Sequence, residues 1–317
     1  MRVVFFDIEC ASVSKTSAKI CAFGYVVTDE AFRIVEQRDI LINPRGGFHL
    51  TDRKGERGLV LPYEYRSFSG CPTFERIYPE IKALLEGADL VVGHAVTNDV
   101  KYLCLETERY RLPSFTFSYA DTQLLFMTRQ NSFERQPGLE TVIENMGVEF
   151  TPHRAVDDAY ATMRIAEALC KEEQVSLSEL LIKYGMRLGK IENYVYGTPT
   201  TRAEIEWKRE VHRKKAERAK RHDEFFRYLN KKGRKKKRRM EGPLVGKAFC
   251  FSRLLEEDID RSKGLLDEIY ARGGTYTTFS ECNVYVSLEN ETGEKIKRAM
   301  ESAEIDAITL QDFMELL

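Results

Sequence analysis

Near its N-terminus the chain contains the run Val3-Val4-Phe5-Phe6-Asp7-Ile8-Glu9, in which two acids interrupt an apolar segment. β-Branched and aromatic residues of this kind favour a strand. Side chains two residues apart project from the same face of a strand, so we expect Asp7 and Glu9 to lie side by side. Burying two carboxylates together is costly unless a cation neutralises them. The pair therefore indicates either a metal site or a strand end whose acids face water.

The segments that follow this strand predict an α/β domain. Further β-rich runs occupy residues 20–27 and 34–42, and a short buried strand is expected at residues 90–93. Apolar residues at helical spacing predict helices at residues 74–85, 100–105, 139–146 and 157–171. Consecutive strands followed by alternating strands and helices predict a mixed five-stranded sheet flanked by helices.

Length and composition limit the class of protein. With 317 residues, 43% of them hydrophobic and 31% charged, the chain is long enough for two globular domains. No run approaches the eighteen or so uncharged apolar residues of a membrane helix, so we expect neither a membrane span nor a signal peptide. The seven cysteines are scattered and odd in number, which favours small buried side chains in a reducing cytoplasm.

Two later segments add acids in a definite order. The run Leu90-Val91-Val92-Gly93-His94-Ala95-Val96-Thr97-Asn98-Asp99 brings an acid to the start of an expected helix, directly after a buried strand. The run His153-Arg154-Ala155-Val156-Asp157-Asp158-Ala159 brings a histidine into a loop, with an acid five residues later in the first turn of a helix. Hard divalent cations prefer carboxylate oxygens, so acids of this kind suit metal-dependent hydrolysis of a phosphodiester.

In this order the motifs resemble the DEDDh exonuclease family, which includes bacterial polymerase proofreading subunits and RNA exonucleases. The resemblance covers residues 1–175 and includes Asp-Ile-Glu, Ile42-Asn43-Pro44, Gly-His-x-x-x-x-Asp and His-x-Ala-x-x-Asp-Ala. It implies a ribonuclease-H-like fold and a 3′–5′ exonuclease. Gly93-His94-Ala95 with Asp121-Thr122-Gln123 downstream looks closer to the RNA-processing branch.

The resemblance also implies a role for each motif residue. Two Mg²⁺ or Mn²⁺ ions would be held by Asp7, Glu9, Asp99 and Asp158, with His153 as the general base. Asp157 would be an acid at a helix N-terminus, where the helix dipole favours it, and His94 would be structural. The chain departs from the family at Cys10-Ala11, where members usually carry Thr after Asp-x-Glu, and at Ala95 and Asn98, where Asn and Phe are commoner.

The net charge of −1 hides a strong asymmetry along the chain. Residues 208–239 contain seventeen Lys or Arg against four acids, in either a solvated helix or a flexible tether. Lys/Arg runs gain affinity for nucleic acid by releasing its condensed counterions, so we expect this tract to hold the substrate. A solubilising linker or, in a eukaryote, a nuclear localisation signal are the alternatives. The densest part of this tract is Lys231, Lys232, Arg234, Lys235, Lys236, Lys237, Arg238 and Arg239.

Residues 242–317 resemble a BRCT domain, particularly that of NAD-dependent DNA ligases, which implies a small parallel-sheet α/β fold. Its matching pieces are residues 246–252, Gly273-Gly274, residues 284–286, 294–299 and 312–317, with Phe313 where many members have Trp. In phosphate-binding members a hydroxyl and a lysine grip the anion. Ser252 and Lys295 occupy those positions, with Arg253 in place of the usual glycine; ordinary surface residues are the alternative. A replication or repair protein, or a phosphorylated partner, is expected at this domain.

The sequence thus predicts three parts: residues 1–175 as the exonuclease domain, 176–241 as a helical and basic linker, and 242–317 as the BRCT domain. The expected function is hydrolysis at DNA or RNA 3′ ends by a two-metal mechanism. The alternative is a catalytically inactive scaffold that binds nucleic acid through the same parts. Retention of all five motif residues argues against that alternative.

Overall fold

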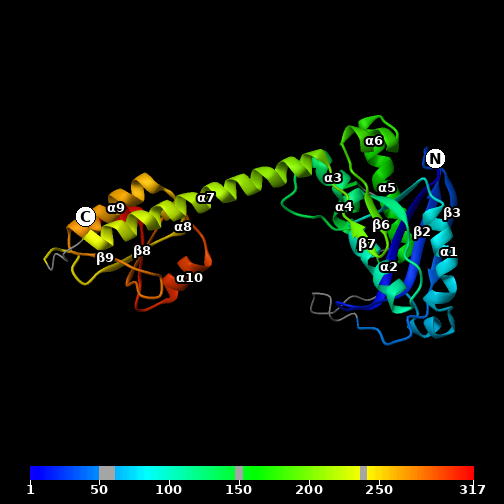
Figure 1. Ribbon diagram of the computed structural model, residues 1–317, viewed down its shortest axis with the longest axis horizontal. Coiled ribbons are helices and arrows are strands. Elements are labelled where there is room, and N and C mark those ends of the chain that lie inside the picture. The colour runs from blue at the N-terminus through cyan, green and yellow to red at the C-terminus, as the bar shows by residue number, and fades with distance from the viewer. Residues whose placement is uncertain (50–60, 147–152, 236–240) are drawn as a thin grey trace. The chain divides into compact units, whose positions relative to one another are not determined.

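The computed structural model of the protein describes residues 1–49, 61–146, 153–235 and 241–317 (Figure 1). The chain forms two compact units, Met1–Lys208 and Arg209–Leu317. Residues 176–208 therefore belong to the first unit, and the basic residues from Arg209 onward belong to the second. The three-part division made from the sequence stays a prediction.

The first unit is built from strands and helices that alternate after an initial three-stranded stretch. Its elements in chain order are β1 (Val3–Val13), β2 (Ala18–Thr28), β3 (Ile34–Leu41), η2 (Tyr65–Gly70), α1 (Phe74–Glu86), β4 (Leu90–Gly93), α2 (Thr97–Arg109), β5 (Phe117–Asp121), α3 (Thr122–Gln130), α4 (Leu139–Met146), α5 (Ala155–Glu173), α6 (Leu177–Lys183), β6 (Gly189–Glu192), β7 (Val195–Gly197) and the start of α7 (Arg202–Lys235).

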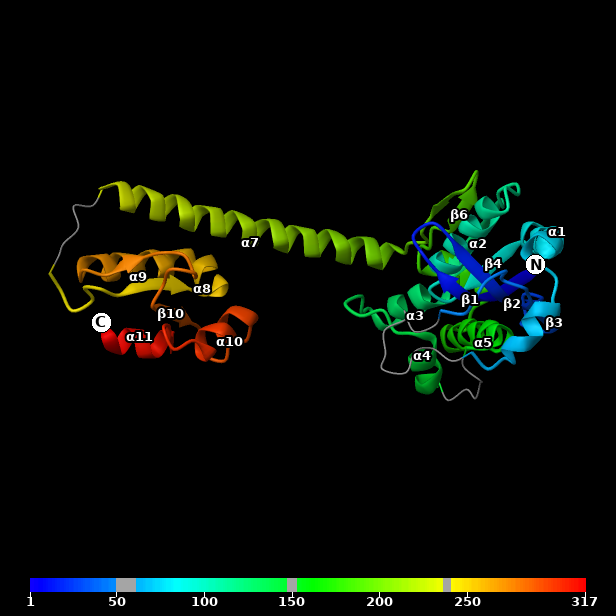
Figure 2. The ribbon, with the colours of Figure 1, turned by 90° about the horizontal axis from the view of Figure 1, so that it is seen from below.

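These strands form one mixed sheet with the order β3-β2-β1-β4-β5-β6-β7. Strand β1 lies inside the sheet, antiparallel to β2 and parallel to β4. The expected α/β architecture with a mixed sheet is confirmed. Helices α1 and α2 cover one face and α5 lies on the other, as Figure 2 shows.

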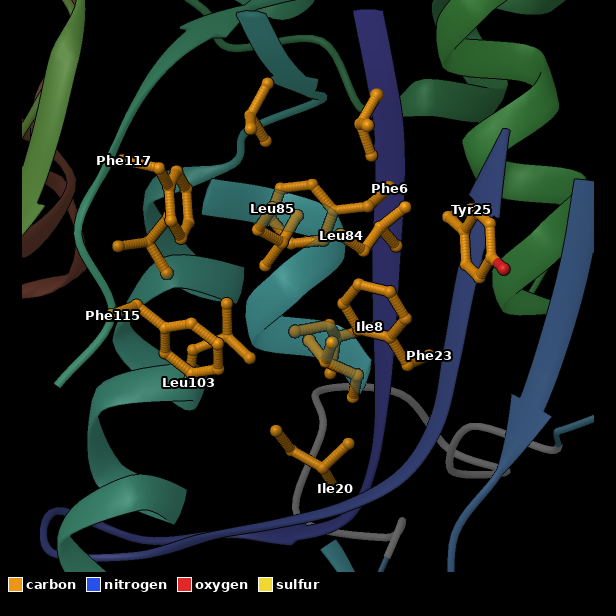
Figure 3. Packing of buried hydrophobic residues seen from close by; sticks show 14 of the residues in the cluster. Phe6, Ile8, Ile20, Phe23, Tyr25, Leu84, Leu85, Leu103, Phe115 and Phe117 are labelled. Atoms are coloured by element: carbon orange, nitrogen blue, oxygen red, sulfur yellow. The ribbon is translucent and has the colours of Figure 1, made fainter. Parts of the chain in front are cut away.

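Alternate residues of β1 enter different cores. Phe6 and Ile8 pack with Phe23 of β2 and with helices α1 and α2, as the close view of this core shows (Figure 3). Val3 and Phe5 face the opposite way, into the core that contains α5. The period of two along a strand therefore assigns Asp7 and Glu9 to the α5 face.

The expectation of five strands was too low, because residues 189–197 form a hairpin that extends the sheet to seven strands. The sequence predicted only a helical linker for this segment. Gly189 allows β6 to approach β5, since a Cβ there would lie 2.5 Å from Cζ of Tyr119. The Tyr119 hydroxyl also donates to the Gly197 carbonyl at 2.9 Å.

The second unit contains a small four-stranded sheet in the order β11-β10-β8-β9, with every pairing parallel. Its elements after α7 are β8 (Ala248–Phe251), α8 (Arg253–Glu257), α9 (Ile259–Ala271), β9 (Thr275–Tyr276), β10 (Val284–Ser287), α10 (Glu294–Glu301), β11 (Asp306–Thr309) and α11 (Leu310–Leu316). This is the parallel α/β arrangement expected for the C-terminal part; its assignment as a BRCT domain stays a prediction.

Helix α7 contributes to the core of the second unit. Phe225 is fully buried, and it packs edge-on against Tyr276 of β9. Tyr228 donates to the Asp267 carboxylate at 2.8 Å, and Lys263 pairs with Glu224 at 2.8 Å. Of the two alternatives for the basic tract, a helix rather than a flexible tether is found as far as Lys235. The part of this helix around Phe225 packs on the second unit and is not fully solvated.

Two expectations from composition are also answered. Six of the seven cysteines are buried and none forms a disulfide, which confirms their assignment as small buried side chains. Among the residues described, no helix is long and apolar enough to cross a membrane.

We predict that Phe225→Ala destabilises the second unit by about 3–5 kcal/mol, because it leaves a cavity in the core. Phe226→Ala is the matched control, since Phe226 is 36% exposed. Trp207, the only tryptophan, packs against Phe133 in the first unit. In urea unfolding followed by circular dichroism, the transition of the second unit should therefore move to lower urea. The transition followed by tryptophan fluorescence, which reports on the first unit, should stay unchanged. Equal effects of the two alanines would contradict the packing role of α7.

Candidate active site

Strand β1 carries Asp7 and Glu9 at the end of its α5 face. They continue the row that begins with Val3 and Phe5, and they pair in register with Gly24 and Ala22 of β2. Glu9 is only 4% exposed. The alternative of a strand end whose acids face water is therefore wrong for Glu9, because its carboxylate is buried.

Gly24 brings the start of α5 onto the strand beside Asp7. A Cβ on Gly24 would lie 2.0 Å from the carbonyl carbon of Ala155 and 2.1 Å from the backbone nitrogen of Val156. These are backbone atoms, so only a glycine permits this approach. The glycine is therefore the reason that Asp158, in the first turn of α5, comes close to the acids of β1.

Asp121 supports the turn that leads to Asp99. Its carboxylate accepts hydrogen bonds from the backbone N–H groups of Ala95 at 3.0 Å and Val96 at 3.2 Å, and from Gln123 at 2.9 Å at the start of α3. Ala95 has a φ of +51°, which is uncommon for a residue with a side chain. These hydrogen bonds join the ends of β5 and β4. Asp99 follows in the first turn of α2, where its side chain is only 6% exposed.

The buried acids repel one another across these elements. Burial raises the pKa of Asp99 well above its usual range, and the charges of Asp7 and Glu9 raise it further. Burial, Asp7 and Glu9 likewise raise the pKa of Asp158 to about 9. Four carboxylates from three distant parts of the sequence therefore converge on one place. A multivalent cation is the kind of ligand that would relieve this repulsion.

His153 lies at the edge of this group. Its backbone N–H donates to Asp158 Oδ2 at 3.1 Å, and its Nδ1 lies 4.0 Å from Glu9 Oε1. One ligand atom each from Glu9, His153 and Asp158 lie within 4.8 Å of one another. The other ring nitrogen, Nε2, lies 3.4 Å from Oε1 of Glu140 on α4, and the side chain is 40% exposed.

A second network holds the start of α5 from the outside. The Ala155 N–H donates to the Tyr63 hydroxyl at 2.9 Å, and that hydroxyl donates to Asp39 of β3 at 3.2 Å. Arg154 Nε donates to the same carboxylate at 3.3 Å. Burial and the charge of Asp39 raise the pKa of Tyr63, which keeps its hydroxyl protonated as a donor.

His94 and Asp157 lie where the sequence suggested. Burial lowers the pKa of His94 to about 4, so the ring is neutral; its nitrogens lie 3.0 Å from the Thr122 hydroxyl and 3.3 Å from the Pro137 carbonyl. Asp157 is in the first turn of α5 and pairs with Arg154 at 3.7 Å. Their structural roles stay predictions that this geometry favours.

The two residues expected to grip phosphate in the second unit, Ser252 and Lys295, each have contacts of their own, and their role stays a prediction. Ser252 is fully buried; its hydroxyl donates to Glu291 Oε2 at 2.6 Å and accepts the Leu255 N–H at 3.3 Å. Lys295 lies over the Phe279 ring and lines a cavity of about 380 Å³ together with Glu256. An anion at Ser252 would have to displace Glu291.

Part of the basic tract has defined contacts. Lys232 pairs with Asp267 at 2.5 Å, and Lys231 is exposed on the last turns of α7. Arg234 and Lys235 belong to helix α7, but the structure describes only their backbone. Lys236, Lys237, Arg238 and Arg239 lie outside the described residues altogether.

Sequence reasoning missed several supporting residues. Asp121 was noted only as part of a family pattern, although its place after an apolar run could have predicted a capping acid. Gly24, Tyr63 and Asp39 belong to no short motif. Their contacts join segments that are far apart in the sequence, so no local pattern predicts them.

We predict that Gly24→Ala weakens both folding and metal binding. The added Cβ must push back the first turn of α5, at a cost of roughly 1–3 kcal/mol. Gly70→Ala is the control, because a Cβ there meets nothing within 4 Å. Calorimetry with Mn²⁺ and thermal unfolding would test this; tight Mn²⁺ binding by Gly24→Ala would contradict the arrangement.

We predict that Asp158→Asn stabilises the protein in EDTA at pH 8. The folded state holds the Asp158 proton up to a pKa of about 9, whereas the unfolded chain releases it near its usual pKa of about 4. The folded state therefore binds more protons between these values, and stability falls as pH rises through that window. The variant should gain roughly 1–3 kcal/mol at pH 8 and little near pH 4. Thermal unfolding measures this gain. An unchanged unfolding midpoint of Asp158→Asn at pH 8 would contradict the repulsion among the acids.

Comparison with known proteins agrees with this site. A family model described as Exonuclease matches residues 4–166, more than half of the 317 residues. The DNA polymerase III subunit epsilon of Aquifex aeolicus (strain VF5) is 32% identical over 118 residues, which are 37% of this chain and 54% of that protein. The chain thus spans about half the length of this curated relative.

Two solved structures are among those that match part of the chain. A 3′-exonuclease in a structure of 3′-end-specific recognition of a histone mRNA stem-loop has a TM-score of 0.47 at 12% identity, covering 62% of this chain and 69% of that one. Exonuclease I of E. coli with a 5cy-dT13 oligonucleotide has a TM-score of 0.42 at 16% identity, covering 58% and 43%. The family implies dependence on divalent metal ions, which agrees with the group formed by Glu9, His153 and Asp158. On the match over residues 4–166, the chain belongs to the exonuclease family.

Proposed function

We propose that the protein removes nucleotides from the 3′ ends of DNA or RNA by metal-dependent hydrolysis. The observation that carries this proposal is the convergence of three buried acids, Glu9, Asp99 and Asp158, with the half-buried Asp7 beside a partly exposed histidine. A buried cluster of this kind destabilises the fold when nothing neutralises it, so its presence favours a function over a structural role.

The donor set suits two hard divalent cations. We propose Asp7, Glu9, Asp99 and Asp158 as the residues that hold Mg²⁺ or Mn²⁺. All four offer carboxylate oxygens, and the charges of Asp7 and Glu9 raise the pKa of the other two. When bound, such ions supply a nucleophile from water and neutralise charge on the leaving 3′ oxygen. The raised pKa of Asp99 and of Asp158 means that metal and protons compete for the same oxygens.

His153 is proposed as the general base. Its Nε2 lies 3.4 Å from the Glu140 carboxylate, an acceptor that favours the proton on this nitrogen. Nδ1 is then left unprotonated on the side of Glu9, where it can accept a proton from water. The hydrogen bond from the His153 backbone to Asp158 fixes the loop that carries the ring.

The rest of the chain is proposed to bring substrate and partners to this site. The basic tract, including residues 231–239, would bind nucleic acid through phosphate contacts without base recognition. The C-terminal unit is proposed to be a BRCT domain that binds a replication or repair protein, or a phosphorylated partner through Ser252 and Lys295. The name of the Aquifex aeolicus relative, a polymerase subunit, supports a replication partner.

Hydrolysis of an oligonucleotide tests the proposal. A single-stranded oligonucleotide labelled at its 5′ end should shorten progressively from the 3′ end with Mg²⁺ or Mn²⁺ and remain intact with EDTA. Asp7→Asn should lower the rate by about two to three orders of magnitude or more, because it removes one anionic ligand. Matched DNA and RNA oligonucleotides in the same assay decide the sugar preference.

Asp157→Asn is the matched control, since Asp157 lies beside Asp158 but pairs with Arg154. Its rate should stay within about threefold of the unmodified chain. Equal rates for the unmodified chain and Asp7→Asn would favour the catalytically inactive scaffold instead.

A further inference from the structure

Helix α7 carries some of its cations on the face that docks and others on the opposite face. One face is docked on the rest of the second unit through Phe225, Tyr228 and Leu229. Cations on or next to this face are matched with acids: Arg218 lies 3.8 Å from Glu257, and Lys232 lies 2.5 Å from Asp267. Their charges serve to hold the helix on the unit.

The opposite face carries a row of exposed cations, which we call the α7 stripe. At about 100° per residue its members lie within about 40° of one another around the helix axis, opposite Leu229. The stripe consists of Arg209, Arg213, Lys220, Arg227 and Lys231, all exposed.

Among the described side chains, most of this row forms no ion pair. Arg213 shares its charge with Glu210 at 2.7 Å and Glu217 at 3.1 Å. For Arg209, Lys220, Arg227 and Lys231, no described carboxylate lies within ion-pair distance. A row of unmatched positive charges on a stiff helix is costly through self-repulsion, and a polyanion would relieve it.

We infer that the α7 stripe binds the phosphate backbone of double-stranded nucleic acid. From Arg209 to Lys231 the helix rises about 33 Å, which is the length of about ten base pairs. A duplex holds its phosphates at fixed positions over this distance, whereas a single strand must be ordered to match a rigid row. The link to catalysis, holding the duplex part of a substrate whose 3′ end is hydrolysed, rests on the proposed function.

An acidic membrane surface is a poorer fit for the same helix. Basic helices that lie on membranes insert an apolar face between the lipids. In this protein Phe225 is fully buried in the second unit, and Leu229 packs against the same core. The face that would insert is therefore already covered.

The experiment measures the salt dependence of binding in EDTA, so that no hydrolysis occurs. The probes are a DNA duplex and an RNA duplex of about 20 base pairs and a single strand of the same length. The stripe variant is Lys220→Gln/Arg227→Gln/Lys231→Gln in the full chain. The matched control is Lys214→Gln/Lys215→Gln/Arg221→Gln, which removes the same charge from other faces of the same helix.

Each phosphate contact adds about 0.9 to the slope of log K against log salt on a duplex. The stripe variant should lower the slope by about two to three on one or both duplexes, whereas the control should lower it by less than about one. Gln is a good helix former, and circular dichroism checks that α7 is retained in both variants. Equal slopes for the two variants, or a loss confined to the single strand, would overturn the inference.

The same preparations separate this inference from the proposed function. Binding is measured in EDTA and hydrolysis of a short single strand in Mg²⁺. Equal slopes overturn the stripe whatever the rate of hydrolysis, whereas an unmodified chain that hydrolyses nothing overturns the exonuclease proposal.

Discussion

The first unit must hold several carboxylates close together against their mutual repulsion, and its other features depend on this constraint. Glu9, Asp99 and Asp158 are each at most 6% exposed, and the charges of Asp7 and Glu9 raise the pKa of both Asp99 and Asp158. Such an arrangement is unfavourable for the protein alone, because buried carboxylates lose water and repel one another. It becomes favourable once a multivalent cation is bound, so stability and function make opposite demands at this point.

The surrounding fold holds the acids together against that repulsion. Strand β1 fixes Asp7 and Glu9 inside a seven-stranded sheet, between β2 and β4. Gly24 permits α5 to rest directly on β2, and Asp121 ties the turn before Asp99 to the end of β5. Each contact uses backbone atoms, which move less than side chains. The acids therefore cannot relax apart without unfolding a larger part of the sheet.

The second unit shows how one charged segment can have two roles. In α7 the docked face uses Phe225 in the core and matches Arg218 and Lys232 with acids, while most cations of the α7 stripe form no ion pair among the described residues. Composition alone cannot separate these roles, because both faces are rich in Lys and Arg. The separation follows from which side of the helix meets the small parallel sheet.

The sequence by itself determined the features that depend on local geometry. The period of two along β1 was enough to predict that Asp7 and Glu9 share a face, and the order of the motifs predicted the family, with Asp99 and Asp158 in first helical turns. Tertiary structure decided the features that join distant segments: the β6–β7 hairpin, the approach at Gly24, the Tyr63–Asp39 support of α5 and the two faces of α7. The physical reason is that backbone preference and hydrophobic period describe neighbours along the chain, whereas close packing selects contacts between residues that no short pattern connects.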